Sequence, residues 1–390
     1  MRIAGCLIVK DAEHTLRRCL GSLDGVVDEI VVYDTGSSDA TVDLARSLGA
    51  IVLEGYWDDD FARARNAALA AVTSDWVLSI DADEWLEADL DRLPQLRASL
   101  NSGPAVLGVQ RFDLTADGSG WCRFNTPRLF RRHGAAWSGR VHESVEVDGT
   151  TIPGRCDPGV LRLAHDGYVD EAEARAKARR NAAIGAAEIE QLRSDPTTSA
   201  PRLARALLDL GRSLASVKEQ ASAVTAFEQA RALVPGSPTA VRAGDHLARA
   251  LLVSGDFVRV GELAAELRAA GTDPRYCDWL LAQALAQSGE PKRAVELLAG
   301  IDELTDPSGH TYDLGAVVEF RALARALSDD LDGALRDLLV AMVGHGRISG
   351  RGNLARQWWG PRPVDGLIIA VRHSGGPFAA DTEHELRAAG

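Results

Sequence analysis

Three carboxylates stand close together in the segment LSIDADEWL, which covers residues 78–86. Asp81, Asp83 and Glu84 directly follow a short apolar run. Neighbouring carboxylates repel one another unless a cation or a hydrogen-bond donor compensates their charge. Their oxygens suit a hard divalent cation such as Mg²⁺ or Mn²⁺, and the alternative is an acidic cap at a helix start. Because a cap requires one acid, we expect Asp81 and Asp83 to serve a site and Glu84 to cap the following helix.

The elements that would position these acids alternate along the first 110 residues. Strands are predicted at 3–9, 29–34, 50–55 and 75–81, and helices at 12–23, 39–49 and 60–72. Alternation with short connections predicts an α/β domain with a mostly parallel, doubly wound sheet. Such sheets bind ligands at the carboxyl ends of their strands, where Asp34 in DTGSSD and Asp81 in DADE both fall.

The remainder of the chain divides into a strand-like segment and a longer helical segment. The segments AVLGVQRFDL, NTPRLFRR and RVHESVEVDGTTIPG predict strands that complete a first domain at 1–168. Residues 169–345 predict an all-α domain, in which turns starting at 218, 255, 289 and 329 recur at spacings of 37, 34 and 40. This pattern resembles tetratricopeptide repeats, and an Ala-rich helical bundle is the alternative. Residues 346–390 are expected to form a cap or tail, with a short strand and a Gly-rich turn in GLIIAVRHSGGPF.

Composition limits the class of protein. Of 390 residues, 46% are hydrophobic and 25% charged, which is typical of a globular protein. The formal net charge of −13 argues against nucleic acid or a membrane surface as a partner. Five cysteines without a CxxC pair predict reduced thiols and a cytoplasmic protein. No apolar run approaches the ~20 residues of a membrane span.

Four motifs together carry a resemblance to a known family. In order they are CLIVKDAEHTLRRCLGSL, DEIVVYDTGSSDATVDLA, DDDFARARNAALAAVTSDWVLSIDADEWL and WSGRVHESVEVDG. The set closely resembles the family 2 glycosyltransferases of GT-A fold, a Rossmann-like architecture, and in particular the branch with C-terminal tetratricopeptide repeats. The resemblance covers about residues 3–170 by motif, and the repeats extend it to most of the chain. One departure is Asp11, where the family usually has Asn.

The resemblance implies roles for the acidic motifs and for their neighbours. Asp83 would bind the divalent metal and Asp81 the donor's ribose or, through water, the metal. His165 would complete the metal coordination, although a lone histidine is more often structural. Asp34 would bind the uracil ring of a UDP-sugar, and Ser37 or Asp39 would shape the turn. The remaining donor-binding candidates are Arg65, Asn66, Arg128 and Arg131; solvated surface arginines are the alternative for the basic ones.

Transfer with inversion at the sugar carbon requires a base for the attacking acceptor. The motif WSGRVHE offers His142 and Glu143, and the resemblance places a carboxylate in this role. We expect Glu143 to be the general base and His142 to orient it or to be a weaker candidate. Since successive strand residues face opposite sides, only one of the two should enter the site.

These observations predict a metal-dependent, inverting glycosyltransferase that uses a nucleotide-sugar donor. The repeat domain would recruit the acceptor, with a peptide or protein side chain favoured, or would form a homodimer. Assembly of lipopolysaccharide, another polysaccharide or a natural product is the alternative acceptor class. A nucleotidyltransferase would use similar acids but would need a Gly-rich, Lys-bearing loop that LIVKDAEHTL lacks. A catalytically inactive repeat scaffold is the alternative of another class.

Overall fold

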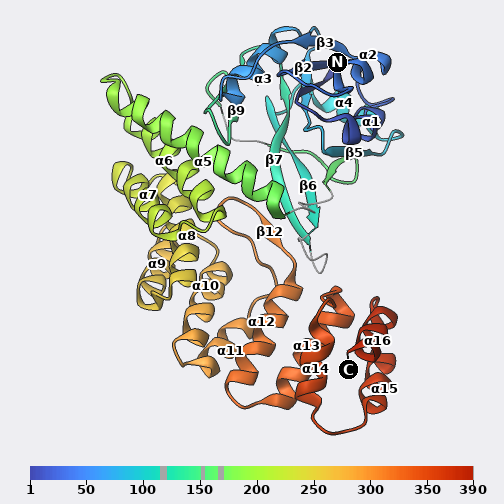
Figure 1. Cartoon of the computed structure of the whole chain (residues 1–390), viewed down its shortest axis with the longest axis vertical. Coiled ribbons are helices and arrows are strands. Elements are labelled where there is room, and N and C mark those ends of the chain that lie inside the picture. Colours follow the sequence, from blue (N-terminus) through green and yellow to red (C-terminus); the bar gives the residue numbers. More distant parts are fainter. Residues whose placement is uncertain (115–120, 151–153, 166–170, 390) are drawn as a thin grey trace. The chain divides into compact units, whose positions relative to one another are not determined.

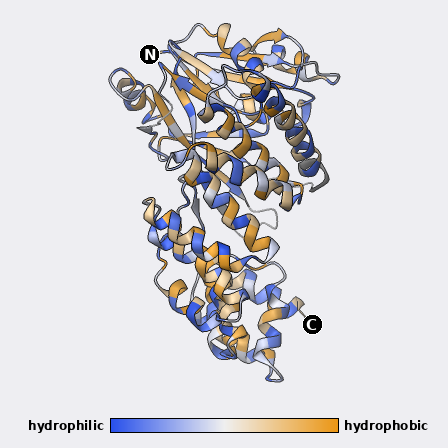
Figure 2. Ribbon diagram, turned by 90° about the vertical axis from the view of Figure 1, so that its left-hand side faces the viewer, coloured by the Kyte–Doolittle hydropathy of each residue, from blue (hydrophilic) through white to orange (hydrophobic). Residues whose placement is uncertain are grey.

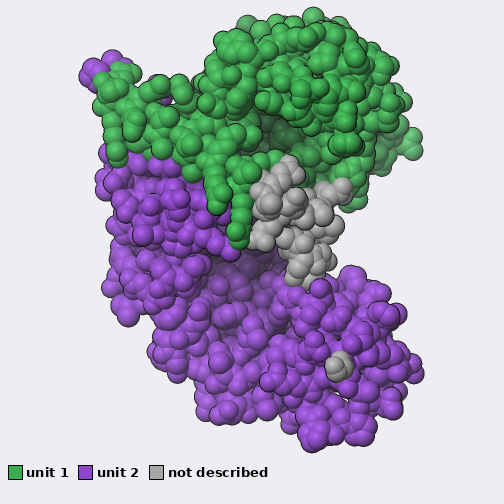
Figure 3. Space-filling model, in the orientation of Figure 1, with its two compact units in different colours: residues 1–113, 123–195 green, residues 114–122, 196–390 purple. Residues whose placement is uncertain are grey.

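The chain forms two compact units. The computed structural model describes residues 1–114, 121–150, 154–165 and 171–389. One unit comprises Met1–Asp113 with Arg123–Asp195, and the other comprises Leu114–Cys122 with Pro196–Gly390 (Figure 3). The division after Asp195, and not after residue 168, assigns the long helix at 171–194 to the first unit.

The first unit is built around a mixed sheet (Figure 1). Its main strand order is β3-β2-β1-β4-β7-β6-β11-β5, with β10 beside β6 and a separate β8–β9 pair. The strands are β1 (Ile3–Val9), β2 (Glu29–Asp34), β3 (Ile51–Glu54), β4 (Trp76–Ser79), β5 (Glu84–Ala88), β6 (Val106–Leu114), β7 (Trp121–Arg131), β8 (Ala135–Ser138), β9 (Ser144–Val147), β10 (Gly154–Arg155) and β11 (Leu161–His165). The helices are α1 (Glu13–Gly21), α2 (Thr41–Ser47), α3 (Phe61–Ala70), α4 (Leu93–Ser99) and α5 (Glu171–Ser194).

Helices cover both faces of this sheet, and the side chains of β1 therefore alternate between two hydrophobic cores. Leu7 and Val9 pack with Leu16 of α1 in one core. Ala4 and Cys6 pack with Ala64 of α3 in the other. A strand buried on both faces is typical of a parallel sheet flanked by helices. The predicted α/β class is therefore confirmed.

The carboxyl ends of the first strands meet at one edge of the sheet. β1 runs parallel to both β2 and β4, and Val9 lies opposite Asp34. The β4 strand ends at Ser79, just before the acidic segment. The two acidic motifs therefore follow strands that end on the same edge, as the sequence predicts.

The second unit consists of antiparallel helix pairs. Its elements are α6 (Ala200–Ser216), α7 (Gln220–Leu233), α8 (Pro238–Ser254), α9 (Phe257–Ala269), α10 (Pro274–Gln287), α11 (Pro291–Ala299), β12 (Thr311–Tyr312), α12 (Leu314–Leu327), α13 (Leu331–His345), α14 (Arg351–Trp359), α15 (Val364–Ser374) and α16 (Ala379–Ala388). Hydrophobic and hydrophilic residues alternate along these helices (Figure 2). The first helices of successive pairs also contact one another, α6 with α8, α8 with α10 and α10 with α12.

Each of the four predicted turns joins the two helices of one pair. Asp256 and Asp330, in two of these turns, accept hydrogen bonds from Arg259 N and Gly333 N and so cap α9 and α13. The sixth residue of three of these turn segments is a fully buried alanine, namely Ala223, Ala294 or Ala334. The turn spacing therefore identified the repeating helix pairs correctly.

The predicted strand in GLIIAVRHSGGPF is wrong, since this segment forms helix α15. Leu367, Ile368 and Val371 are its buried residues, at helical and not alternating spacing. Gly375, with φ 63°, ends the helix in the left-handed conformation, which explains the glycine there. Residues of α14, α15 and α16 pack with α13 in one hydrophobic core, so this tail extends the helical unit.

None of the helices in the described part of the chain combines the length and the hydropathy needed to cross a bilayer. Four free cysteines, Cys6, Cys19, Cys156 and Cys277, are buried. Burial raises the pKa of the Cys6 thiol to about 12 and that of Cys156 to about 11. Such thiols are protonated and unreactive at neutral pH.

We expect His246 of α8 to make the second unit sensitive to acid. Its ring stacks on Phe227 at 5.6 Å between centroids, and burial, reinforced by Arg249 and Arg212, lowers its pKa well below the usual value. A neutral folded histidine costs stability once the unfolded histidine binds a proton, so the loss begins below about pH 6.5. Relative to His246→Phe, urea unfolding should show the wild type losing about 1 kcal/mol more on going from about pH 6.5 to 5.5. Parallel pH dependence of the two proteins would contradict the burial of a neutral ring.

Candidate active site

Asp81, directly after β4, is the centre of a series of alternating charges. Its Oδ1 accepts a hydrogen bond from Arg65 Nη2 at 2.7 Å, and its Oδ2 accepts one from Arg128 Nη2 at 2.6 Å. Burial disfavours the charged carboxylate, yet Arg128 and Arg65 hold the pKa of Asp81 well below its usual range. The complete charge series is Glu143, Arg65, Asp81, Arg128, Glu84, Arg111 and Asp113.

Glu84 belongs to this series, and the prediction that it caps a helix is wrong. Residue 84 begins strand β5, which pairs with β11, and the next helix, α4, begins only at Leu93. The Glu84 side chain is 1% exposed, and its Oε1 accepts hydrogen bonds from Arg111 and Arg128, both at 3.0 Å. Burial raises the pKa of Glu84 in spite of these guanidinium groups. Its function is therefore to hold two arginines in the interior.

Asp83 lies outside the charge series and is 41% exposed. Its Oδ2 is 3.5 Å from His165 Nε2 and 3.9 Å from Lys177 Nζ of α5. The hydrogen bond with Asp83 raises the pKa of His165 above its usual value. Strand β11 explains this proximity, because it places His165 opposite Glu84 of β5, the neighbour of Asp83. Two residues predicted to bind a metal, far apart in sequence, are thus brought together.

The donor set around Asp83 fits a divalent cation only in part. His165 Nδ1 lies 3.7 Å from Asp113 Oδ1, a buried oxygen without a hydrogen-bond partner in the described structure. A carboxylate beside the second ring nitrogen is the usual support of a metal-binding histidine. Asp81 does not join the pair, because both its oxygens bind arginines. Within the described ranges no group of three or more acidic, His or Cys side chains could hold a metal alone. Asp83 and His165 would supply one carboxylate and one imidazole.

The candidate base Glu143 lies in the loop before β9 and contacts the same arginine as Asp81. Its Oε1 accepts a hydrogen bond from Arg65 Nε at 2.5 Å, and the side chain is 11% exposed. Arg65 also donates to Ser79 Oγ at 3.1 Å and lies over the ring of Trp137. A buried helical arginine thus links the two acids, so the solvated-surface alternative for Arg65 is wrong.

The neighbouring His142 has φ 52°, a left-handed backbone conformation that is uncommon outside glycine. His142 and Glu143 therefore lie in a turn before β9, which begins at Ser144. The alternation of side chains between two faces, expected for a strand, does not apply to these two residues. The chain reverses at the point where Glu143 meets Arg65.

Asp34, at the end of β2, is buried and organises the loop that follows it. Its Oδ1 accepts hydrogen bonds from the amides of Gly36 and Ser37, both at 2.9 Å, and its Oδ2 accepts one from Ser37 Oγ. Ser37 Oγ in turn accepts a hydrogen bond from Asp11 N at 2.8 Å. Asp11 has φ 47°, and Asn and Asp are the non-glycine residues that best tolerate this conformation. The exchange of the family's Asn for Asp therefore preserves the turn.

Three other predicted residues lie in contacts that do not involve the charge series. Asn66 exchanges two hydrogen bonds of 2.9 Å with the backbone of Trp137 and so joins α3 to β8. Arg131 is 44% exposed and pairs with Asp148. Asp39 lies in the turn before α2 and accepts a hydrogen bond from Thr41 N at 3.0 Å.

Sequence reasoning missed Arg111 and Asp113, which complete the charge series on β6. Their side chains share a face because they are two residues apart on a strand, and Arg111 Nη2 donates to Asp113 Oδ2 at 2.6 Å. The segment QRFDL carries this spacing, but it does not show that the shared face points toward Glu84. Pairing of β6 with β11, which places Asp113 opposite His165, supplies that information.

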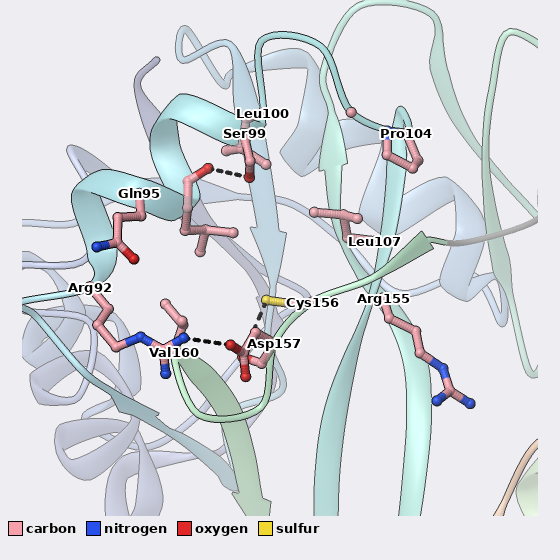
Figure 4. Close-up of a pocket in the computed structure, with 12 residues that line it drawn as sticks. Arg92, Gln95, Ser99, Leu100, Pro104, Leu107, Arg155, Cys156, Asp157 and Val160 are labelled. Atoms are coloured by element: carbon pink, nitrogen blue, oxygen red, sulfur yellow. Dashed lines mark hydrogen bonds and ion pairs between the residues drawn. The ribbon is translucent and has the colours of Figure 1, made fainter.

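A cavity of about 350 Å³ lies elsewhere in the first unit (Figure 4). Side chains from α4 and from the segment 154–160 line it, and Arg92 and Asp157 form an ion pair of 2.6 Å at its side. It contains none of the predicted site residues. The arrangement of charges at the strand ends, and not the presence of a cavity, therefore identifies the candidate site.

Comparison with known proteins supports the assignment of the first unit. Residues 6–144 match the family model described as glycosyl transferase family 2. A TPR repeat-containing protein of Synechococcus elongatus is 40% identical over 147 residues, which are 37% of this chain and 36% of that protein. The glycosyltransferase SunS of Bacillus subtilis is 29% identical over 195 residues, which are 49% of this chain and 45% of that protein.

The crystal structure of S. aureus TarS 1-349 is similar over 69% of this chain and 90% of that one, with 13% identity and a TM-score of 0.36. The matched segments span less than half of the length of the two relatives named above. The matched segment includes most of β1, all of β2 and β4, and the loop of Glu143, whereas β11 with His165 lies beyond it. Residues 6–144 of this chain are therefore similar to the glycosyl transferase family 2 model, and the match ends before His165.

Proposed function

We propose that the chain is a metal-dependent glycosyltransferase that transfers a sugar from a nucleotide-sugar donor, with UDP as the expected nucleotide. The observation that carries the proposal is the pair of the exposed Asp83 and the largely buried His165 beside the buried charge series, with Asp83 inside the segment that matches family 2. The diphosphate leaves as an anion and needs positive charge where it departs. The charge of Asp81 is compensated by Arg65 and Arg128. Asp81 would orient these two guanidinium groups beside the donor's ribose.

The proposed cation, Mn²⁺ or Mg²⁺, would be held by Asp83 and His165. When bound, it would neutralise the charge that develops on the diphosphate oxygens. Asp113 would fix the His165 ring through its Nδ1 side, and Lys177, near Asp83, would add a second positive charge at this edge. Asp34 would bind the base of the nucleotide, since its carboxylate has a lone pair beyond the three hydrogen bonds of its own loop.

Glu143 would take the proton of the acceptor as the acceptor attacks the sugar carbon, with inversion of configuration. Only Arg65 is hydrogen-bonded to this carboxylate within the part of the chain that the structure describes, and it binds Oε1. Oε2 would therefore receive the proton while Arg65 fixes the orientation of the group. His142, in the adjacent turn, is the weaker candidate for this role.

The acceptor in this proposal is a peptide or protein side chain recruited by the helical unit. Repeated helix pairs offer an extended surface that suits a linear polypeptide. A polysaccharide or another glycan remains the alternative acceptor, and a homodimer through the helical unit the alternative use of that surface. Buried, protonated cysteines support a cytoplasmic location.

A thermal-shift screen tests the donor assignment without an acceptor. UDP-, GDP-, dTDP- and ADP-sugars would be added to the full chain with Mn²⁺ or Mg²⁺ and with EDTA. We expect one nucleotide class to raise the Tm by a few degrees only with metal, since a ligand at about 100 times its Kd stabilises the native state by ~2.7 kcal/mol. A shift from triphosphates alone would favour a nucleotidyltransferase, and no shift from any sugar nucleotide would favour an inactive scaffold.

A further inference from the structure

Helix α5 lies beyond the segment that matches family 2 and packs against the first unit beside the candidate site. Two contacts hold it there. The guanidinium carbon of Arg180 lies 5.4 Å from the centre of the Phe61 ring, and Gln191 Oε1 accepts a hydrogen bond from Arg140 Nη2 at 2.9 Å. Phe61 N donates to the carbonyl of Arg140 at 3.0 Å, so both contacts reach the point where α3 meets the loop before β9.

Lys177, three residues before Arg180 on α5, lies beside the candidate metal pair. Its Nζ is 3.9 Å from Asp83 Oδ2, the oxygen that lies 3.5 Å from His165 Nε2. Both members of the ion pair are accessible, since the Lys177 side chain is 36% exposed and the Asp83 side chain 41%. An accessible ion pair contributes little to stability, and a lysine carries its charge on a flexible stem. Lys177 can therefore turn toward an anion beside Asp83.

The arginines of the charge series are less available to a ligand than Lys177. Arg65 and Arg128 are 9% and 10% exposed, and Arg111 is 23% exposed. Each of these three guanidinium groups already binds two carboxylates of the protein. A departing diphosphate needs positive charge aimed at it. Lys177 would supply that charge, because a cation held by Asp83 would compensate this carboxylate and leave the ammonium group to the donor.

We propose that Lys177 binds the sugar-bearing phosphate of the donor and stabilises it as the leaving group. The inference rests on the proposed transferase function and assigns one further residue to it. The bond between the sugar carbon and the phosphate oxygen breaks, and its electron pair stays on that oxygen. The ammonium of Lys177 donates a hydrogen bond to this phosphate and keeps its own proton. The acceptor's proton goes to Glu143, as proposed above, so the charges of the step balance.

Calorimetric titration of the full chain with a nucleoside diphosphate and with its monophosphate tests this assignment, because the monophosphate lacks the phosphate in question. UDP and UMP with Mn²⁺ are the expected pair, and the thermal-shift screen decides the nucleoside. We expect Lys177→Met to bind UDP about tenfold more weakly, through the loss of one charge-assisted contact, and to bind UMP like the wild type. Lys177→Arg keeps the charge and should restore UDP binding. The control Arg179→Met, at an exposed position of the same helix, should bind both nucleotides like the wild type.

Binding of Mn²⁺ alone, followed by electron paramagnetic resonance of the free ion, separates this role from a structural one. Lys177→Met removes a like charge beside Asp83, so its affinity for Mn²⁺ should equal or exceed that of the wild type. Weaker binding of both Mn²⁺ and UDP would mean that Lys177 only positions Asp83, and would overturn the inference. Wild-type UDP affinity in Lys177→Met, or equal losses for UDP and UMP, would also overturn it but would leave the proposed transferase intact. If the wild type binds no nucleotide of any class, the proposed function fails and the inference fails with it.

Discussion

Glu143→Gln should lower the kcat of sugar-nucleotide turnover by about 10²–10⁴-fold, the usual contribution of general-base catalysis. The amide oxygen of glutamine can still accept a hydrogen bond from Arg65 Nε, so the loop before β9 should keep its position. The KM for the donor should change little, because the proton is removed from the acceptor and not from the donor. The measurement is release of nucleoside diphosphate, with water as the acceptor where no better one is known.

Glu146→Gln is the matched control, since Glu146 lies on the adjoining strand β9 and outside the charge series. It should retain the wild-type kcat. If Glu143→Gln also keeps the wild-type kcat, Glu143 is not the base, and His142→Ala then tests the remaining candidate of that motif.

Glu84→Ala should destabilise the first unit by about 3–5 kcal/mol, the cost of breaking a buried ion pair. The substitution leaves Arg111 and Arg128 in the interior with one carboxylate fewer, and it removes the acceptor for Asp81 N. Urea unfolding, followed by fluorescence of the tryptophans in this unit, measures the loss through the midpoint. Glu84→Gln, which keeps an acceptor oxygen, should lose less.

Glu87→Ala provides the comparison on the same strand. Its carboxylate pairs with Arg162 at 41% exposure, so its removal should cost no more than ~1 kcal/mol. Equal losses for Glu84→Ala and Glu87→Ala would contradict the assignment of Glu84 to a buried structural role.

The main elements of both units could be predicted because their signals are local. Apolar runs of strand length and amphipathic helices give β1, β2 and β4 with α1 and α3. Recurring turns give the helix pairs, and two of these turns carry a side-chain cap, at Asp256 and Asp330. In GLIIAVRHSGGPF the sequence signal is ambiguous, because a short apolar run fits a buried strand as well as a buried helix.

The sequence predicts which motifs contribute to the candidate site, but not the environment of each side chain within it. Asp81 and Asp83 are two residues apart, yet one is bound by two arginines and the other is exposed beside His165. The spacing cannot separate these environments, because they depend on β7 and β11, which come from distant parts of the sequence. The role of Glu84 is hidden for the same reason, since its partner Arg111 lies on β6.

The most direct test of the account is metal-dependent turnover of the sugar nucleotide by the wild type, Asp83→Ala and the control Asp91→Ala. Asp91 is an exposed acid of the segment between β5 and α4, away from His165. We predict nucleoside diphosphate release that requires Mn²⁺ or Mg²⁺ in the wild type, persists in Asp91→Ala and falls to background in Asp83→Ala. Metal-dependent release that persists in Asp83→Ala would contradict the central claim that Asp83 holds the cation at this edge of the sheet.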